Sequence, residues 1–411
     1  MNRKEMLRLT SLMAGATILA GFKPLFREIR QDEQSEIKPF RINFDKDQIR
    51  DLYRRIDAMK WPKIPFETGW QAGTNDGVLR ELVNYWLHEY DWFSIQENLN
   101  QLDHFHATIE GENLHFVWYK DQRNEQNFPI LLLHGWPSSF HEFSDAAPYI
   151  VNGMGKKQGF NLVVPSLPGF VFSDAPQKSG IHIGKIAERL HSLMQKLGYD
   201  HYAVHGGDWG STIAVELARK FPDSIVGLHY VAVSTGKLPE KSEDETEQQY
   251  IERFKKFNAQ GKAYFNILAT KPQTIAYAHQ DSPVGFLSWI LEKYWSWTDH
   301  KQDLWETLDR DDVLTTAMLY WLSGSVLSSS RIYYETIRML PEDWTSGQVT
   351  VPTGYSNFPK DFLSPPPTLA NPDLTAKLEY YQEMPKGGHF PALEEPELWA
   401  KELVTFFSML K

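Results

Sequence analysis

The chain has 411 residues, 42% of them hydrophobic, and carries a formal net charge of −11. This acidic balance argues against nucleic acid as a partner. The chain has no cysteine, which excludes disulfides, thiolate nucleophiles and cysteine metal sites. Its length allows one large catalytic domain with additions, or about two or three smaller domains.

Residues 1–22 have the composition of a signal peptide. Arg3, Lys4 and Arg8 precede an apolar run at residues 9–22 that is too short to span a bilayer comfortably. The opening resembles a twin-arginine export signal, with Lys4 in place of the second arginine. We therefore expect export, to the periplasm. The alternatives are a cytoplasmic protein with a frayed N-terminal helix and a membrane-associated protein with an uncleaved anchor.

Residues 36–125 are predicted to form an N-terminal module. Apolar residues repeat with the spacing of an amphipathic helix at residues 45–59 and again at residues 77–88. Two runs with strand character, residues 105–109 and 114–119, flank a short polar turn and predict a hairpin. No cluster of titratable residues in this module requires chemistry.

Residues 126–236 alternate between strand, loop and helix patterns. The continuous apolar run at residues 130–133 is typical of a strand that is buried on both faces of a parallel sheet, and residues 161–165 are predicted to form another strand. A helix is predicted near residues 183–197, and a further strand at residues 225–233. The alternation predicts the first part of a doubly wound α/β core.

The turn Gly206-Gly207-Asp208-Trp209-Gly210 lies between an apolar strand and a helix. A chain that turns this sharply needs small neighbours around the turning residue. The pattern is that of a nucleophile elbow, with Asp208 at the serine position. A carboxylate there can attack carbon and form an ester. The alternative is that Asp208 only caps the helix that follows.

Residues 237–345 begin with a charged, proline-interrupted stretch and continue with a mostly helical, aromatic pattern. A helical block inserted into an α/β sheet usually covers the site as a cap. The sheet is predicted to resume in residues 346–411, with strands at 348–352 and 378–382 and a last helix at 396–410.

His389 lies between two glycines and the last helix, on a loop that follows the last predicted strand. Ligands meet doubly wound sheets at such loops. Asp361 follows the preceding strand, where a carboxylate can hold the imidazole in its working tautomer. The order of nucleophile, acid and histidine matches the α/β-hydrolase order. Glu394 and Glu395 are alternative acids, although we expect them to begin the last helix.

Three motifs now carry a family resemblance: His134-Gly135-Trp136-Pro137, the Gly206–Gly210 turn, and Gly387-Gly388-His389-Phe390. With them, the chain from about residue 39 onward resembles the microsomal-type epoxide hydrolases of the α/β-hydrolase fold, including the juvenile hormone epoxide hydrolases. The N-terminal module is similar to the strap of that family. The resemblance implies an α/β-hydrolase sheet with an inserted helical cap.

The resemblance also implies the residues that surround the nucleophile. Two cap tyrosines, at the positions of Tyr264 and Tyr333, would donate hydrogen bonds to the epoxide oxygen. Tyr334 competes with Tyr333, and core packing remains the alternative for all of them. The backbone N–H groups of Trp209 and Trp136 would form an oxyanion hole. No metal and no organic cofactor are needed.

The implied reaction converts an epoxide to a vicinal diol. Asp208 attacks an epoxide carbon and forms an alkyl ester, which is hydrolysed by water that His389 activates with Asp361 as its orienting partner. The expected partners are a small apolar epoxide and water, for a monomer or a homo-oligomer without a stable membrane span. A haloalkane dehalogenase, which shares the aspartate and Trp209, is one alternative. An inactive binding protein on the same fold is the other.

Overall fold

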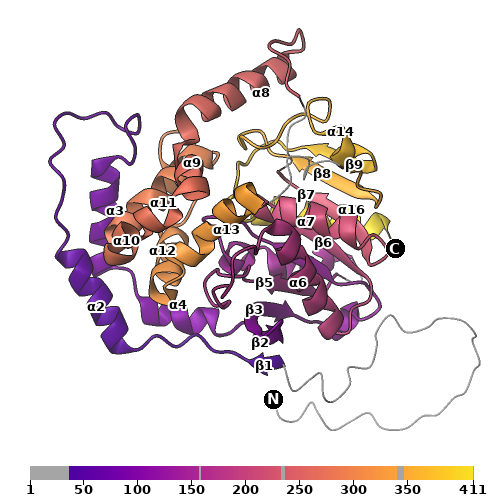
Figure 1. Cartoon of the computed structure of the whole chain (residues 1–411), viewed down its shortest axis with the longest axis horizontal. Helices are drawn as coiled ribbons and strands as arrows, with labels where there is room; N and C mark the ends of the chain where they lie inside the picture. Colours follow the sequence, from indigo (N-terminus) through magenta and orange to yellow (C-terminus); the bar gives the residue numbers. More distant parts are fainter. Residues whose placement is uncertain (1–36, 157–158, 233–236, 340–346, 411) are drawn as a thin grey trace, which may run out of the picture.

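The computed structural model of the chain describes residues 37–156, 159–232, 237–339 and 347–410. Among these residues, nine strands form one sheet, in the order β1-β2-β3-β5-β4-β6-β7-β8-β9 (Figure 1). The predicted signal segment at residues 1–22 lies outside the described residues, and so does Val233, where the fourth core strand was expected to end.

The sheet has an antiparallel end and a parallel body. The antiparallel strands are β1 (Ile37–Pro39), β2 (His104–Ile109) and β3 (Glu112–Tyr119). The parallel strands are β4 (Ile130–Leu133), β5 (Leu162–Pro165), β6 (Tyr202–Gly206), β7 (Ile225–Tyr230), β8 (Thr353–Asn357) and β9 (Leu378–Glu383). Because β5 and β6 flank β4, the strand order reverses beside β4. This arrangement confirms the predicted doubly wound core, and ligands meet such sheets at the carboxyl ends of the strands.

Helices cover both faces of the parallel strands. In the described parts of the chain, these helices include α5 (Ala147–Val151), α6 (Ile183–Lys196), α7 (Trp209–Lys220) and α16 (Pro396–Met409). A Cβ on Gly206 of β6 would lie 2.2 Å from the backbone of Gly210 in α7. The preceding residue, His205, lies 5.0 Å from the Trp399 ring in α16. Because adjacent side chains of a strand point to opposite faces, α7 and α16 lie on opposite faces of the sheet.

One predicted strand is displaced in the structure. The buried valines Val349 and Val351 predict a strand at residues 348–352, whereas β8 begins at Thr353. That prediction is wrong because Pro352 has no N–H to donate to a ladder, and the N–H of Val349 donates to the Asp373 carbonyl at 2.9 Å and not to a strand. Pairing with β7 begins at Thr353, opposite Leu228.

The N-terminal module runs from the sheet edge to the cap. Its helices are α2 (Lys46–Asp57), α3 (Asp76–His88) and α4 (Trp92–Leu99). The first is fixed by a capping box, in which Asp45 accepts from the Gln48 backbone and Gln48 accepts in return. The Tyr85 hydroxyl donates to Asp311 of the cap at 2.8 Å. Trp70 stacks on Trp295 of the cap, with ring centroids 4.4 Å apart. The module therefore ties the cap to the sheet.

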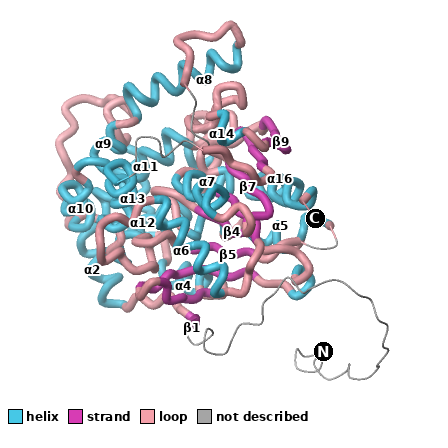
Figure 2. The backbone as a smooth tube through the Cα atoms, turned by 45° about the vertical axis from the view of Figure 1, so that its right-hand side comes forward, coloured by secondary structure: helices cyan, strands magenta, loops and turns pink. Residues whose placement is uncertain are grey.

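The cap is helical, as its composition predicts. Its main helices are α8 (Glu245–Lys256), α9 (Ala263–Thr270), α10 (Pro272–Asp281), α11 (Pro283–Trp297), α12 (Arg310–Ser323) and α13 (Val326–Met339). Figures 1 and 2 show α9 to α13 gathered at one side of the sheet, with α2 beside them. Two short helices follow the cap, α14 (Pro372–Thr375) and α15 (Pro391–Glu394). Across the described parts of the chain, we find no helix with both the length and the apolarity that a membrane crossing requires.

Buried histidines link the hairpin to the core. The Nδ1 atom of His104 lies 2.9 Å from Nε2 of His115, whose Nδ1 lies 2.8 Å from the Ser166 hydroxyl. The other ring nitrogen of His104 faces the Leu99 carbonyl at 2.8 Å, so it must donate. Every ring nitrogen of this pair has a partner while both rings are neutral. Burial lowers the pKa of both histidines from 6.5.

We expect these buried histidines to lower the free energy of unfolding as the pH decreases below about 6.5. In that range the unfolded chain binds protons that the buried rings exclude, and stability is lost until the folded histidines also titrate. For His134, burial lowers the pKa to about 4, so its contribution is lost between those two values. Each such ring adds a slope of at most about 1.4 kcal/mol per pH unit. Denaturant unfolding between pH 7.5 and 5 measures the slope. His115→Gln should flatten it, whereas substitution of the exposed His88 should not.

Candidate active site

The elbow between β6 and α7 holds Asp208 in a strained conformation, with φ 48° and ψ −128°. Its neighbours must be small, because a Cβ on Gly210 would lie 2.1 Å from the Leu133 carbonyl oxygen and one on Gly135 would lie 2.2 Å from Asp208 Oδ1. The Asp208 side chain makes no capping hydrogen bond to α7. The alternative prediction, that Asp208 merely caps the helix, is therefore wrong.

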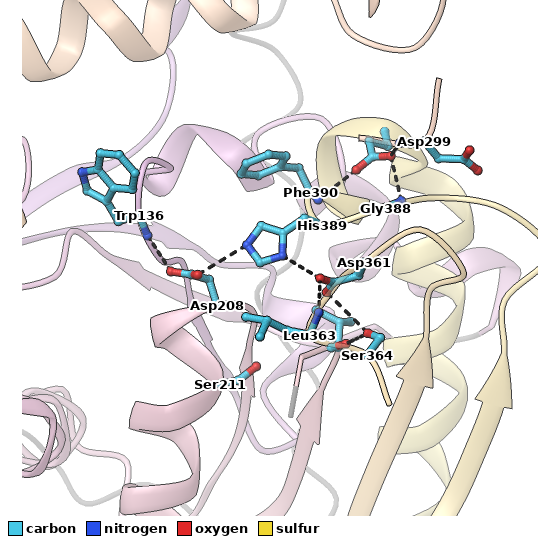
Figure 3. Close-up of polar contacts among 12 residues, drawn as sticks. Trp136, Asp208, Ser211, Asp299, Asp361, Leu363, Ser364, Gly388, His389 and Phe390 are labelled. Atoms are coloured by element: carbon cyan, nitrogen blue, oxygen red, sulfur yellow. Dashed lines mark hydrogen bonds and ion pairs between the residues drawn. The ribbon is translucent and has the colours of Figure 1, made fainter. Parts of the chain in front are cut away.

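The Asp208 carboxylate lies between a backbone donor and an imidazole (Figure 3). Trp136 N–H donates to Oδ1 at 2.8 Å, and Oδ2 lies 3.4 Å from Nε2 of His389. Trp209 is the first residue of α7, and N–H groups in the first turn of a helix have no partner within the helix. The family resemblance implies the N–H groups of Trp136 and Trp209 as oxyanion donors. The first contacts the carboxylate, and the second belongs to the residue that follows Asp208 in the chain.

His389 also contacts the predicted acid. Its Nδ1 lies 2.9 Å from Oδ1 of Asp361, which is fully buried. The same oxygen accepts from Leu363 N–H at 2.9 Å, and the Ser364 hydroxyl donates to the other oxygen at 3.4 Å. A carboxylate at Nδ1 makes that nitrogen the donor and directs Nε2 towards Asp208. The structure thus brings together residues from the ends of three different strands.

The electrostatics of His389 depend on both carboxylates. Burial by itself would lower the pKa of this imidazole, but the charges of Asp361 and Asp208 outweigh it and raise the pKa to about 10. With Asp208 ionised, His389 is therefore a cation at neutral pH. Loss of the Asp208 charge would remove part of this stabilisation and lower the pKa of His389.

Glu394 is neither the acid partner of His389 nor part of the last helix. It lies in α15, and its carboxylate accepts from Gly388 N–H at 2.8 Å, Phe390 N–H at 2.9 Å and Asp299 N–H at 2.8 Å. These bonds hold the backbone on both sides of the histidine and join it to the cap. The other alternative acid, Glu395, forms an ion pair with Lys386 at 2.6 Å. Sequence reasoning did not identify Glu394 as the residue that holds this loop. The only signal in the sequence is an acidic residue about one helical turn after the Gly-Gly-His motif.

Two cap tyrosines lie over the elbow. Tyr264 of α9 stacks on Trp136 with ring centroids 5.6 Å apart, and Tyr333 of α13 meets Trp209 edge-on at 4.9 Å. Both rings are buried. Burial, with the charge of Asp208 adding to it, raises the pKa of both hydroxyls well above 10, so they are donors at neutral pH. Among the described residues, the Tyr333 hydroxyl makes no hydrogen bond of good geometry. Its polar neighbours are Tyr264 and Trp209, so it is available to bind a substrate atom.

Tyr334, the competitor of Tyr333, contacts two arginines of its own helix, α13. Its ring lies under two guanidinium groups, 5.3 Å from Arg331 and 5.0 Å from Arg338.

The described residues contain no group of three or more His, Asp or Glu placed to hold a metal ion.

An aspartate on a strand–helix elbow, paired with a histidine and a second carboxylate after later strands, defines an α/β hydrolase. The family of the alpha/beta hydrolase fold matches residues 129–396, and the family described as the epoxide hydrolase N terminus matches residues 37–143. The chain belongs to the epoxide hydrolases of this fold, and it is an enzyme.

Individual relatives support this membership. A putative epoxide hydrolase of Stigmatella aurantiaca is 36% identical over 91% of this chain and 86% of its own length. Epoxide hydrolase 1 of Oryctolagus cuniculus is 33% identical over 92% of this chain and 90% of its length. The crystal structure of juvenile hormone epoxide hydrolase from Bombyx mori has a TM-score of 0.83 and 31% identity, covering 92% of this chain and 96% of that one.

Proposed function

We propose that this epoxide hydrolase works through a covalent ester on Asp208. The observation that carries the proposal is the division of labour between the two carboxylate oxygens. Oδ1 is held by Trp136 N–H, while Oδ2 is free of backbone donors in the contacts described above and faces His389. Oδ2 attacks an epoxide carbon and the carbon–oxygen bond of the ring breaks. Oδ1 then becomes the ester carbonyl oxygen, already in contact with its donor.

Protons balance within the site. The alkoxide released from the ring is stabilised by Tyr264 and Tyr333 and takes up one proton. Ester formation removes the negative charge of Asp208, which lowers the pKa of His389 and releases one proton from it. The first half-reaction therefore needs no net proton from solvent, and it leaves His389 neutral.

Neutral His389 then acts as a general base in the second half-reaction. It takes a proton from a water molecule, and the hydroxide attacks the ester carbonyl carbon. The tetrahedral oxyanion is stabilised by the N–H groups of Trp136 and Trp209, where one such donor contributes about 10²–10³ in rate. Collapse releases the vicinal diol and restores ionised Asp208 beside protonated His389. Asp361 holds the imidazole in place throughout.

The function is tested with aryl, terminal and lipid-derived epoxides, each assayed for diol formation. A small apolar epoxide should be converted, because the rings around the elbow are aromatic and buried. Chloroalkanes of matching size, assayed for halide, form the comparison. Halide release without diol formation would identify a haloalkane dehalogenase instead, and absence of both reactions would support a binding protein.

Replacement of both cap tyrosines should slow ester formation far more than either single replacement. Each hydrogen bond to developing charge contributes about 1.5–3 kcal/mol, or roughly tenfold to a hundredfold in rate. Single-turnover measurements on Tyr264→Phe, Tyr333→Phe and the double variant test this. Tyr334→Phe is the matched control, because its ring lies under two arginines outside the site. Near-normal ester formation in the double variant would refute the assignment.

We propose that residues 1–22 direct export, on the basis of their basic start and short apolar run. N-terminal sequencing of the protein from its native host should find a chain that lacks about the first twenty residues. An intact Met1 on protein from the cytosolic fraction would contradict export.

A further inference from the structure

A lysine is buried in the cap beside one of the two tyrosines. Lys293 of α11 is 5% exposed, and its ammonium lies 4.8 Å from the centre of the Tyr264 ring and 5.0 Å from that of Trp289. Lysine is almost never fully buried unless it is paired. The reaction described above does not use this charge.

The charge of Lys293 is only partly compensated. Its ammonium forms an ion pair with Glu292, whose other oxygen accepts from the Ser296 hydroxyl at 3.0 Å. The Lys293 side chain is 6% exposed and that of Glu292 is 26% exposed. Water therefore screens the carboxylate more than the ammonium. The other titratable group nearby is His279 of α10, and burial lowers its pKa to about 4, which keeps it neutral.

The same tyrosine ring also contacts residues beside the elbow. Tyr264 stacks on Trp136, whose backbone N–H contacts Asp208, and it meets Tyr333 edge-on at 6.0 Å. The ammonium of Lys293 thus acts directly on the Tyr264 ring, and the reacting carboxylate lies beyond Trp136, which stacks on the same ring.

We propose that Lys293 is a positioning residue, whose ammonium makes the Tyr264 hydroxyl a stronger proton donor to the epoxide oxygen. As that proton moves towards the oxygen, negative charge grows on the phenol, and a cation near the ring stabilises it. The inference rests on the proposed role of Tyr264. In this role Lys293 contacts neither the substrate nor the attacking water.

The proton on Lys293 gives this effect a pH dependence. Burial lowers the pKa of Lys293 to about 7. The ion pair with Glu292 opposes the effect of burial and favours the charged form. The single-turnover rate of ester formation should therefore fall as the pH rises through and above 7. Glu292→Gln removes the partner of the ammonium and should move this fall to lower pH.

The test compares ester formation in Lys293→Met, Lys293→Arg and Lys262→Met with the unaltered enzyme. Lys293→Met should be about threefold to thirtyfold slower and should lose the pH dependence near 7. Lys293→Arg keeps the charge to higher pH and should retain most of the rate. Lys262 is the matched control, because its ammonium lies 5.2 Å from the ring of Phe265, which has no hydroxyl.

A double-mutant cycle separates this inference from the proposed function. In a Tyr264→Phe background, Lys293→Met should cost nothing further in ester formation, because the hydroxyl through which it acts is absent. An equal loss in both backgrounds would overturn the inference and leave the role of Tyr264 intact. A Tyr264→Phe enzyme with normal ester formation would overturn both. If Lys293→Met does not fold, a flat pH profile of the unaltered enzyme, or a Lys293→Arg variant without activity, would also overturn the inference.

Discussion

Replacing His389 with alanine should trap the enzyme as an ester on Asp208. Turnover should fall by about 10²–10⁴-fold, the usual contribution of a general base. The first half-reaction should survive, since attack requires the carboxylate and the cap tyrosines but not the base. One equivalent of epoxide should be consumed in a burst. Mass spectrometry should find the peptide that contains Asp208 heavier by the mass of the epoxide.

The controls for this experiment lie within the same chain. Replacing the exposed His88 with alanine should leave turnover unchanged and give no lasting adduct. An adduct on any other residue, or none at all with a folded His389→Ala enzyme, would contradict the covalent route. Asp361→Asn should lie between the two, because the imidazole keeps its place but loses the charge that holds its tautomer.

Replacing Asp208 with alanine should abolish both the adduct and turnover. The competing mechanism is direct attack of water on the epoxide, with Asp208 only orienting a neighbour. The two mechanisms differ in the source of the new oxygen in the diol. In the covalent route that oxygen comes from the carboxylate, so a single turnover in ¹⁸O-labelled water should give unlabelled diol.

Labelled oxygen in the diol from the first turnover, together with no adduct in the His389→Ala enzyme, would establish the direct route. The fold and the family would be unaffected by that result. Conversely, label that enters the Asp208 carboxylate during repeated turnover, and the diol only afterwards, would support the ester. The pairing of Oδ1 with Trp136 N–H predicts which of the two carboxylate oxygens stays with the protein at each cycle.

Much of the site could be predicted from local sequence. Gly135, Gly206 and Gly210 are required by contacts of 2.1–2.2 Å that a Cβ at each position would make, and such a requirement leaves a pattern that can be recognised in the sequence. The position of His389 between two glycines and a helix could be predicted in the same way. Asp361 is predicted from its place in the chain order. The strand before it is predicted at residues 348–352, several residues before β8. Pro352 was the missed signal there, since a proline cannot donate to the ladder.

The sequence by itself determined the alternation of strands and helices, the elbow with its aspartate, and the helical character of the cap. Each follows from local backbone sterics and the period of the apolar residues. Only the tertiary structure decided that Glu394 clamps the histidine loop to Asp299, and that the ammonium of Lys293 lies over Tyr264. Those contacts join residues from different helices and loops, and their formation depends on how the cap packs against the sheet. A local sequence pattern does not encode that packing, so Glu394 carried only a weak signal and Lys293 carried none.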